Sequence, residues 1–193
     1  MDISRPIFPL EHPRQKLDAG THATMGVGLA YCIAAWSVYN LPQKTKKIIA
    51  FEGDSALGFA AMEIETMRRH DMDVLVFCMN NSGIYSGDAT AAADWRAKHR
   101  RLLDSSGRGR SPGNRSDRLK SSSLMHEARY EQLAAMVGGR GIFVRTEEDL
   151  QVATREGYAE SRVTVVNVII EPGNDKSISF AWMEKKKRME SKM

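Results

Sequence analysis

Two short apolar runs, separated by a segment of helix length, most constrain the fold of this chain. The runs occupy residues 48–51 and 74–79, and polar residues follow each of them, Gly53-Asp54 after the first and Asn80-Asn81 after the second. Residues 57–70 between the runs carry apolar side chains at helical spacing. A strand, a helix and a second strand in this order place the two strands parallel in one sheet. The sequence therefore predicts an α/β fold.

The rest of the chain continues this alternation. Thr146 with Asp149 three residues later is typical of a helix N-terminus and predicts a helix through about residue 160. Pro172-Gly173 ends the last apolar run. The other predicted elements are helices at residues 24–39 and 125–137, a short strand at 142–144 and a buried strand at 163–170.

Asp54 and Asn81 each stand where a predicted strand ends. Ligands bind in the crevice at the carboxyl ends of parallel strands, so both side chains should face one site. A carboxylate, an amide oxygen and a backbone carbonyl suit Mg²⁺, which keeps phosphate and water oxygens as its other ligands. Asp54 alone would equally suit a helix cap. Together with Asn81 and the nearby glycines Gly53 and Gly83, it favours a metal held on a diphosphate.

These residues resemble a known motif. Gly53-Asp54-Ser55 followed by Asn80-Asn81 resembles the diphosphate-binding motif of thiamine-diphosphate enzymes, which Gly-Asp-Gly or Gly-Asp-Ser opens and Asn-Asn closes. The longer stretches at residues 53–66 and 80–85 are similar to 2-hydroxyacyl-CoA lyases and the related oxalyl-CoA decarboxylases. Residues 17–28 also fit, and the resemblance covers roughly residues 1–100 and 124–182.

The resemblance implies an open, mainly parallel sheet with helices on both faces, and thiamine diphosphate with Mg²⁺ as cofactors. It assigns Asp54, Asn81 and the backbone of Gly83 to the metal. Met25 would support the bent cofactor from beneath, although core packing at a helix start explains it equally well. The full set of cofactor-binding residues implied by the resemblance is Thr24, Met25, Gly26, Gly53, Asp54, Ser55, Ala56, Asn81, Gly83, Ile84 and Tyr85.

The activity implied by the resemblance is cleavage of a 2-hydroxyacyl-CoA into formyl-CoA and an aldehyde, as in fatty acid α-oxidation. Oxalyl-CoA decarboxylation is the alternative. The family's enzymes are three-domain chains, and the resemblance reaches only their C-terminal domain. The glutamate that activates the cofactor belongs to the pyrimidine domain, so no catalytic residue is assigned to this chain. A homo-oligomer or a partner chain would supply that domain, and a non-catalytic remnant that at most binds the cofactor is a further reading.

One domain is expected over residues 1–182, since 193 residues suit a single core. Residues 105–123 are rich in Ser, Gly and Arg without apolar periodicity, which predicts a disordered insertion. Residues 183–193 form a basic tail ending in Ser191-Lys192-Met193, which resembles a peroxisomal signal. We expect a peroxisomal protein, or a cytoplasmic one if that tripeptide is not read.

The charge distribution and the lengths of the apolar runs argue against a nucleic-acid-binding or membrane-spanning protein, and the cysteine positions indicate reduced thiols. The net charge of +4 is concentrated at residues 96–120 and 185–188, which lack the interleaved aromatics of a nucleic-acid surface. Nucleic acid is therefore disfavoured as a partner. No apolar stretch reaches membrane-spanning length and no signal peptide opens the sequence. Cys32 and Cys78 lie in apolar runs and are expected to be buried, reduced thiols.

Overall fold

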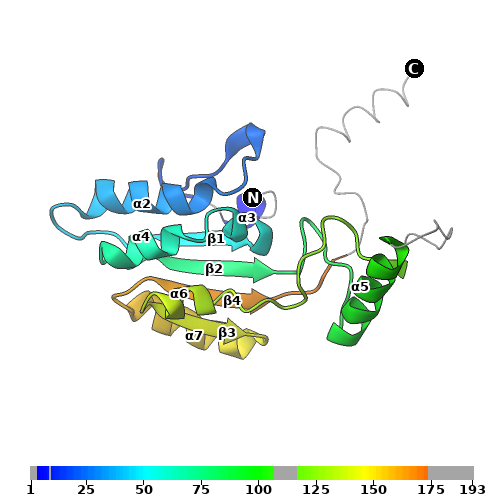
Figure 1. The fold of residues 1–193 in the computed structure, drawn as a ribbon. Helices are drawn as coiled ribbons and strands as arrows, with labels where there is room; N and C mark the ends of the chain where they lie inside the picture. Colours follow the sequence, from blue (N-terminus) through cyan, green and yellow to red (C-terminus); the bar gives the residue numbers. More distant parts are fainter. Residues whose placement is uncertain (1–3, 9, 107–116, 174–193) are drawn as a thin grey trace, which may run out of the picture.

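The computed structural model describes residues 4–8, 10–106 and 117–173 (Figure 1). Its strands are β1 (Ile49–Gly53), β2 (Leu75–Asn80), β3 (Arg140–Val144) and β4 (Thr164–Ile169). Its helices are α1 (Ser4–Ile7), η1 (Gly20–His22, a 3-10 helix), α2 (Val27–Asn40), α3 (Asp54–Phe59), α4 (Glu63–Arg69), α5 (Ala92–Ser106), α6 (Gln132–Met136) and α7 (Glu147–Ala159).

The four strands form one parallel sheet in the order β1-β2-β4-β3. Strand β2 pairs with β1 from Ile49↔Leu75 and with β4 from Leu75↔Thr164, so it is central and almost wholly buried. The predicted parallel α/β sheet is confirmed. Because β1, β2 and β4 run the same way, the segments that follow them meet at one edge of the sheet, which we call the carboxyl edge.

Helices cover both faces of the sheet, as predicted, and each face has its own apolar core. Helices α2, α3, α4 and α6 contribute Leu29, Leu57, Met67 and Ala134 to one core, which also contains Val76. Helix α7 contributes to the second core, which consists of Leu75, Phe77, Val144, Ala153, Val166 and Val168. Along β2 the side chains alternate between these two cores, as expected for a strand covered on both sides.

Three predicted helices differ in extent from those observed. The helix expected at residues 57–70 is two helices, because the amide of Ala60 bonds to the Leu57 carbonyl three residues back and closes α3. Helix α2 begins three residues later than expected, since Gly26 has a left-handed φ of 86°. Residues 125–131 form turns instead of helix, and the Ala128 carbonyl accepts side-chain amides from elsewhere in the chain.

The structure describes both ends of the segment at residues 105–123 that was predicted to be a disordered insertion. Residues 105 and 106 end α5, a helix that the sequence patterns did not predict and in which Trp95 donates to the Leu124 carbonyl at 2.8 Å. Residues 117–123 are irregular with a turn at residues 121 and 122, and there Leu119 is buried and Ser123 is bridged to Gly83. Residues 107–116 lie outside the part of the chain that the structure describes.

Ion pairs and a hydrogen bond around the buried Asp73 carboxylate connect α2 to the start of β2. Asp73 is 2% exposed, and its carboxylate accepts a hydrogen bond from Trp36 Nε1 at 2.9 Å. Lys44 and Lys47 pair with its other oxygen at 2.5 and 3.3 Å. Burial by itself would raise the pKa of Asp73, but the Lys44 and Trp36 hydrogen bonds and the lysine charges outweigh it and lower that pKa. Burial lowers the pKa of Lys47, and Asp73 only partly offsets this.

We expect Asp73→Asn to lower the free energy of unfolding at pH 7 by about 3 kcal/mol, as when one partner of a buried ion pair is removed. Because the folded-state pKa of Asp73 is lowered, its stabilising contribution is present above the unfolded-state pKa and disappears as the pH falls through the folded-state value. Urea unfolding of both proteins from pH 7 to pH 3 measures this. The difference in the free energy of unfolding between the two proteins should shrink towards acid pH. A difference that is independent of pH would contradict the prediction.

Candidate functional site

Asp54 and Asn81 lie side by side at the carboxyl edge, as their positions after β1 and β2 predict. Asp54, the first residue of α3, is 2% exposed. Its Oδ1 accepts a hydrogen bond from the amide of Ser55 at 2.8 Å, and its Oδ2 accepts one from the amide of Gly83 at 3.1 Å. The Oδ1 of Asn81 accepts from the same Gly83 amide at 3.1 Å. One carboxylate oxygen and one carboxamide oxygen therefore flank a single N–H group.

Residues 81–85, which we call the Asn81 loop, are held in a tight conformation. The side-chain amide of Asn81 donates to the Tyr85 carbonyl at 2.9 Å and closes the loop. Ser82 and Tyr85 adopt left-handed φ values of 63° and 66°. A Cβ added at Gly83 would stand 2.3 Å from the Ser86 carbonyl oxygen, so only glycine fits there. The loop geometry thus explains the glycine of the motif.

The electrostatic surroundings of Asp54 favour a cation. Burial raises the pKa of Asp54, and the Ser55 and Gly83 amides only partly compensate. Burial also raises the pKa of Glu52, whose carboxylate lies against Gly28 of α2. Burial and then the charge of Asp54 raise the pKa of Tyr130 to about 12. A bound cation would lower the cost of keeping Asp54 ionised in these surroundings.

The other residues expected in the site lie before α2, around the start of α3 and in the Asn81 loop. Thr24-Met25-Gly26 leads into α2, and Gly26 packs against α3, since a Cβ there would come within 2.9 Å of the Phe59 Cβ. Met25 is 37% exposed and Tyr85 is 78% exposed. Gly53 precedes α3, and Ser55 and Ala56 belong to its first turn. The Ser55 amide donates to Asp54, and the amide of the half-buried Ile84 donates to the Ser122 carbonyl.

A network of buried polar side chains beneath the Asn81 loop was not predicted from the sequence, although Asn80 belongs to the motif. Asn80 and Asn167 are 1% and 0% exposed, and their side-chain amides both donate to the Ala128 carbonyl at 2.9 Å. Glu131, 4% exposed, accepts from Asn167 at 2.8 Å. One signal was available, because Asn167 interrupts the apolar run at residues 163–170. A carboxamide inside a buried strand needs hydrogen-bond partners and therefore marks a polar network.

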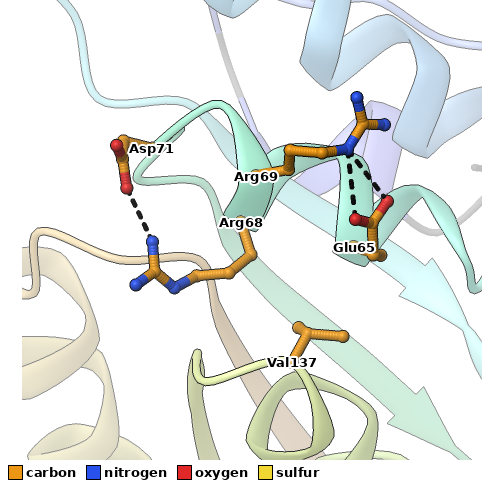
Figure 2. Close-up of a pocket in the computed structure, with 5 residues that line it drawn as sticks. All are labelled: Glu65, Arg68, Arg69, Asp71 and Val137. Carbon is orange, nitrogen blue, oxygen red and sulfur yellow. Dashed lines mark hydrogen bonds and ion pairs between the residues drawn. The ribbon is translucent and has the colours of Figure 1, made fainter.

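A surface pocket elsewhere in the molecule is a weaker candidate. Glu65, Arg68, Arg69, Asp71 and Val137 line it (Figure 2). Both guanidinium groups are already paired, Arg68 with Asp71 at 2.6 Å and Arg69 with Glu65 at 3.1 Å. The pocket lies where α4 ends and the chain turns back towards the start of β2, at the sheet edge opposite Asp54. The residues that line this pocket are not among those of the candidate site at the carboxyl edge.

Three further findings concern the residues that the structure describes. Cys32 and Cys78 are buried and unpaired, as predicted, and burial raises the pKa of Cys32 to about 12. No three or more His, Cys, Asp or Glu side chains gather into a metal-binding group within the described ranges. None of the described helices combines the length and the apolar character needed to cross a membrane.

Comparison with known proteins shows the family of this chain. The family described as "Thiamine pyrophosphate enzyme, C-terminal TPP binding domain" matches residues 2–168. The 2-hydroxyacyl-CoA lyase of Arabidopsis thaliana is 37% identical over 89% of this chain, and 2-hydroxyacyl-CoA lyase 1 of Homo sapiens is 36% identical over 95%. The oxalyl-CoA decarboxylase of Escherichia coli K12 is 36% identical over 89%.

These relatives are longer proteins. The chain spans 27%, 30% and 26% of the Arabidopsis, human and Escherichia coli relatives, respectively. Among solved structures, benzoylformate decarboxylase from Polynucleobacter necessarius superposes with a TM-score of 0.51 at 15% identity, over 77% of this chain and 24% of that one. This likeness supports the fold alone. The chain belongs to the thiamine pyrophosphate enzymes, as a C-terminal TPP-binding domain homologous to those of 2-hydroxyacyl-CoA lyases and oxalyl-CoA decarboxylases.

Proposed function

We propose that this chain is the diphosphate-binding half of a thiamine-diphosphate- and Mg²⁺-dependent carbon–carbon lyase acting on 2-hydroxyacyl-CoA. The observation that carries the proposal is the convergence of Asp54 Oδ2 and Asn81 Oδ1 on the Gly83 amide. It supports a divalent cation held by one carboxylate oxygen, one carboxamide oxygen and the Gly83 carbonyl, with diphosphate and water oxygens as the remaining ligands. The buried, acidic surroundings of Asp54 further support a cation.

The remaining residues would bind and orient the cofactor. Thr24, Met25 and Gly26 would contact it from the start of α2, and Met25 keeps enough exposed surface to do so. Gly53, Ser55 and Ala56 would border the diphosphate, and Ile84 and Tyr85 would line the cofactor. Thiamine diphosphate, when bound, would supply a carbanion as the nucleophile for a carbonyl group and a thiazolium ring that accepts the electrons of the broken carbon–carbon bond. The residues of this chain would hold that group in place, and the Mg²⁺ bound by Asp54 and Asn81 would offset the charge of its phosphates.

We further propose that turnover requires a pyrimidine domain, from a longer form of this chain, a second copy or a partner protein. The similarity to three-domain lyases supports this. A chimera tests it, in which residues 1–182 replace the C-terminal domain of the Arabidopsis lyase. We expect the chimera to release formyl-CoA from a 2-hydroxyacyl-CoA, while the same chimera with Asp54→Asn does not.

Two outcomes of the chimera experiment separate the alternatives. Formyl-CoA from oxalyl-CoA but not from a 2-hydroxyacyl-CoA would favour the decarboxylase. A folded chimera that binds the cofactor and turns over neither substrate would contradict the lyase proposal and leave a domain that only binds the cofactor. The C-terminal tripeptide Ser191-Lys192-Met193 favours the first reaction over the second, because it resembles a peroxisomal address; this is an argument from location and not from the site.

Peroxisomal delivery through Ser191-Lys192-Met193 is part of the proposal, because this tripeptide resembles a peroxisomal address and follows the basic run at residues 185–188. These residues lie outside the part of the chain that the structure describes. A fluorescent protein ending in residues 182–193 should concentrate in peroxisomes, and the same fusion without the last three residues should stay diffuse. Identical diffuse signals from both fusions would contradict this prediction.

A further inference from the structure

Three buried polar side chains lie beneath the Asn81 loop and are all hydrogen-bonded. Asn80 ends β2, Asn167 lies within β4, and Glu131 directly precedes α6. Their exposed fractions are 1%, 0% and 4%. A buried polar group left unpaired costs about 1–3 kcal/mol, so such residues persist inside a sheet only where each is paired. None of them is among the residues that contact the metal or the diphosphate in the proposed site.

The three side chains form a continuous line of hydrogen bonds to the Asn81 loop. Glu131 Oε2 accepts from Asn167 Nδ2 at 2.8 Å. Asn167 Oδ1 accepts from Asn80 Nδ2 at 3.1 Å, and Asn80 Oδ1 accepts from the backbone amide of Ser82 at 3.1 Å. Both side-chain amides also donate to the Ala128 carbonyl at 2.9 Å. The line therefore begins at a carboxylate and ends on the backbone next to Asn81.

The Glu131 carboxylate and the Ala128 carbonyl, which can only accept, fix the direction of every bond in this line. Ionised Glu131 can only accept hydrogen bonds, so Asn167 must turn its NH₂ group towards it and its oxygen towards Asn80. Asn80 must in turn present its NH₂ group to Asn167, which leaves its oxygen for the Ser82 amide. Arg129 Nε donates to the other oxygen of Glu131 at 2.5 Å and balances its charge.

The end of the line is a strained residue next to the proposed ligands. Ser82 has a φ of 63°, which serine rarely adopts and which persists only where the surroundings hold it. Ser82 Oγ also accepts from the amide of Glu127 at 2.9 Å, and its carbonyl accepts from Leu124 at 2.9 Å. The next amide is that of Gly83, which faces Asp54 and Asn81. A change at Ser82 would therefore move the atoms of the proposed metal site.

We propose that Glu131 is a positioning residue for this site, acting through Asn167 and Asn80 on the Ser82 amide. Glu131 and the Ala128 carbonyl together set the orientation of both carboxamides, and these hold the Asn81 loop in the conformation that presents Asn81 and the Gly83 carbonyl to a metal. The identity of the ligand rests on the proposed function. The hydrogen bonds that hold the Asn81 loop do not depend on that function.

Substitutions that separate the acceptor from the size of the side chain test this role. Glu131→Gln keeps the size but leaves one side-chain oxygen for two donors, Arg129 and Asn167. Glu131→Asp keeps a carboxylate for both donors on a side chain that is one methylene shorter. Glu148→Gln, the same change on the exposed first turn of α7, is the matched control.

Two properties are measured for each variant. NMR without any ligand measures the hydrogen-exchange rates of the Ser82 and Gly83 amides, and calorimetry measures the affinity for thiamine diphosphate in the presence of Mg²⁺. We expect faster exchange at Ser82 in Glu131→Gln and about 10–100-fold weaker binding, the usual cost of losing a group that orients a metal ligand. Glu131→Asp should show slower exchange and tighter binding than Glu131→Gln, and Glu148→Gln should match the unaltered chain in both.

The proposal is overturned if Glu131→Gln leaves both measurements unchanged, or if Glu131→Asp disturbs both more than Glu131→Gln does. Should Glu131→Gln fail to fold, a folded Glu131→Asp with slow Ser82 exchange supports the proposal, and a Glu131→Asp that also fails to fold overturns it. If the unaltered chain does not bind thiamine diphosphate, the proposed function fails, while the exchange measurement still decides the role of Glu131. A residue that only fills space would tolerate glutamine better than aspartate.

Discussion

Replacing Asp54 by asparagine is expected to weaken Mg²⁺-dependent binding of thiamine diphosphate by at least about 100-fold. Loss of a group that merely orients a metal ligand costs about 10–100-fold, and Asp54 is proposed to be the only charged ligand from this chain. Asparagine has nearly the same shape, so the effect isolates the charge. Calorimetric titration of both proteins at a fixed Mg²⁺ concentration measures it.

The same substitution should hardly change stability in the absence of metal. Burial raises the pKa of Asp54, which means that its ionised form opposes folding at neutral pH. The asparagine side chain removes that cost and loses one acceptor for the Ser55 or Gly83 amide, so the free energy of unfolding should change by less than about 1 kcal/mol. Asp71→Asn, on the exposed turn after α4, is the control and should change neither property. Equal affinities of the unaltered chain and the Asp54→Asn variant would contradict the proposed ligand.

Replacing Gly83 by alanine is expected to lower the free energy of unfolding by about 1–3 kcal/mol, the usual cost of inserting a methyl group into a filled space. The new Cβ would stand 2.3 Å from the carbonyl oxygen of Ser86, and backbone atoms cannot move aside as a flexible side chain would. The loop would have to open, which displaces the amide that Asp54 and Asn81 share. Cofactor binding should therefore be lost together with stability.

Gly58→Ala provides the matched control for this substitution. Gly58 lies in α3, and no atom stands within 4 Å of the position that its Cβ would occupy. Alanine should stabilise the helix there by about 0.5–1 kcal/mol and leave binding unchanged. Urea unfolding and calorimetric titration of both variants test the pair. If Gly83→Ala behaved like Gly58→Ala, the loop geometry described above would be wrong.

Local sequence patterns predicted the individual strands and helix caps that position the site. The apolar runs fixed β1 and β2, and parallel pairing then placed Asp54 beside Asn81 although 27 positions separate them. The helix cap at Thr146 was also predicted, and its Oγ1 accepts from the Asp149 amide at 3.1 Å. These features follow from side-chain spacing and from rules of strand connection that hold for any chain.

Features that depend on distant side chains were not predictable in this way. Residues 125–131 have helical spacing but form turns, because the Ala128 carbonyl accepts from Asn80 and Asn167, which lie 48 and 39 positions away. The buried line from Glu131 to Ser82 joins three separate elements and has no local pattern. Only the isolated asparagine within the last apolar strand pointed to it.

The assignment of thiamine diphosphate itself came from the motif, and the family comparison confirms it. The spacing of Asp54 and Asn81 alone indicated a metal on a diphosphate. The metal and its ligands remain a proposal, which the geometry supports through the shared Gly83 amide.

Calorimetric titration of the purified chain with thiamine diphosphate, with and without Mg²⁺, tests the central claim most directly. The account predicts saturable binding at one site per chain that requires Mg²⁺, and no binding of thiamine, which lacks the diphosphate. This holds for the isolated chain because Asp54, Asn81 and Gly83 all belong to it. A folded chain that binds no thiamine diphosphate at saturating Mg²⁺, or that binds thiamine equally well, would contradict the account.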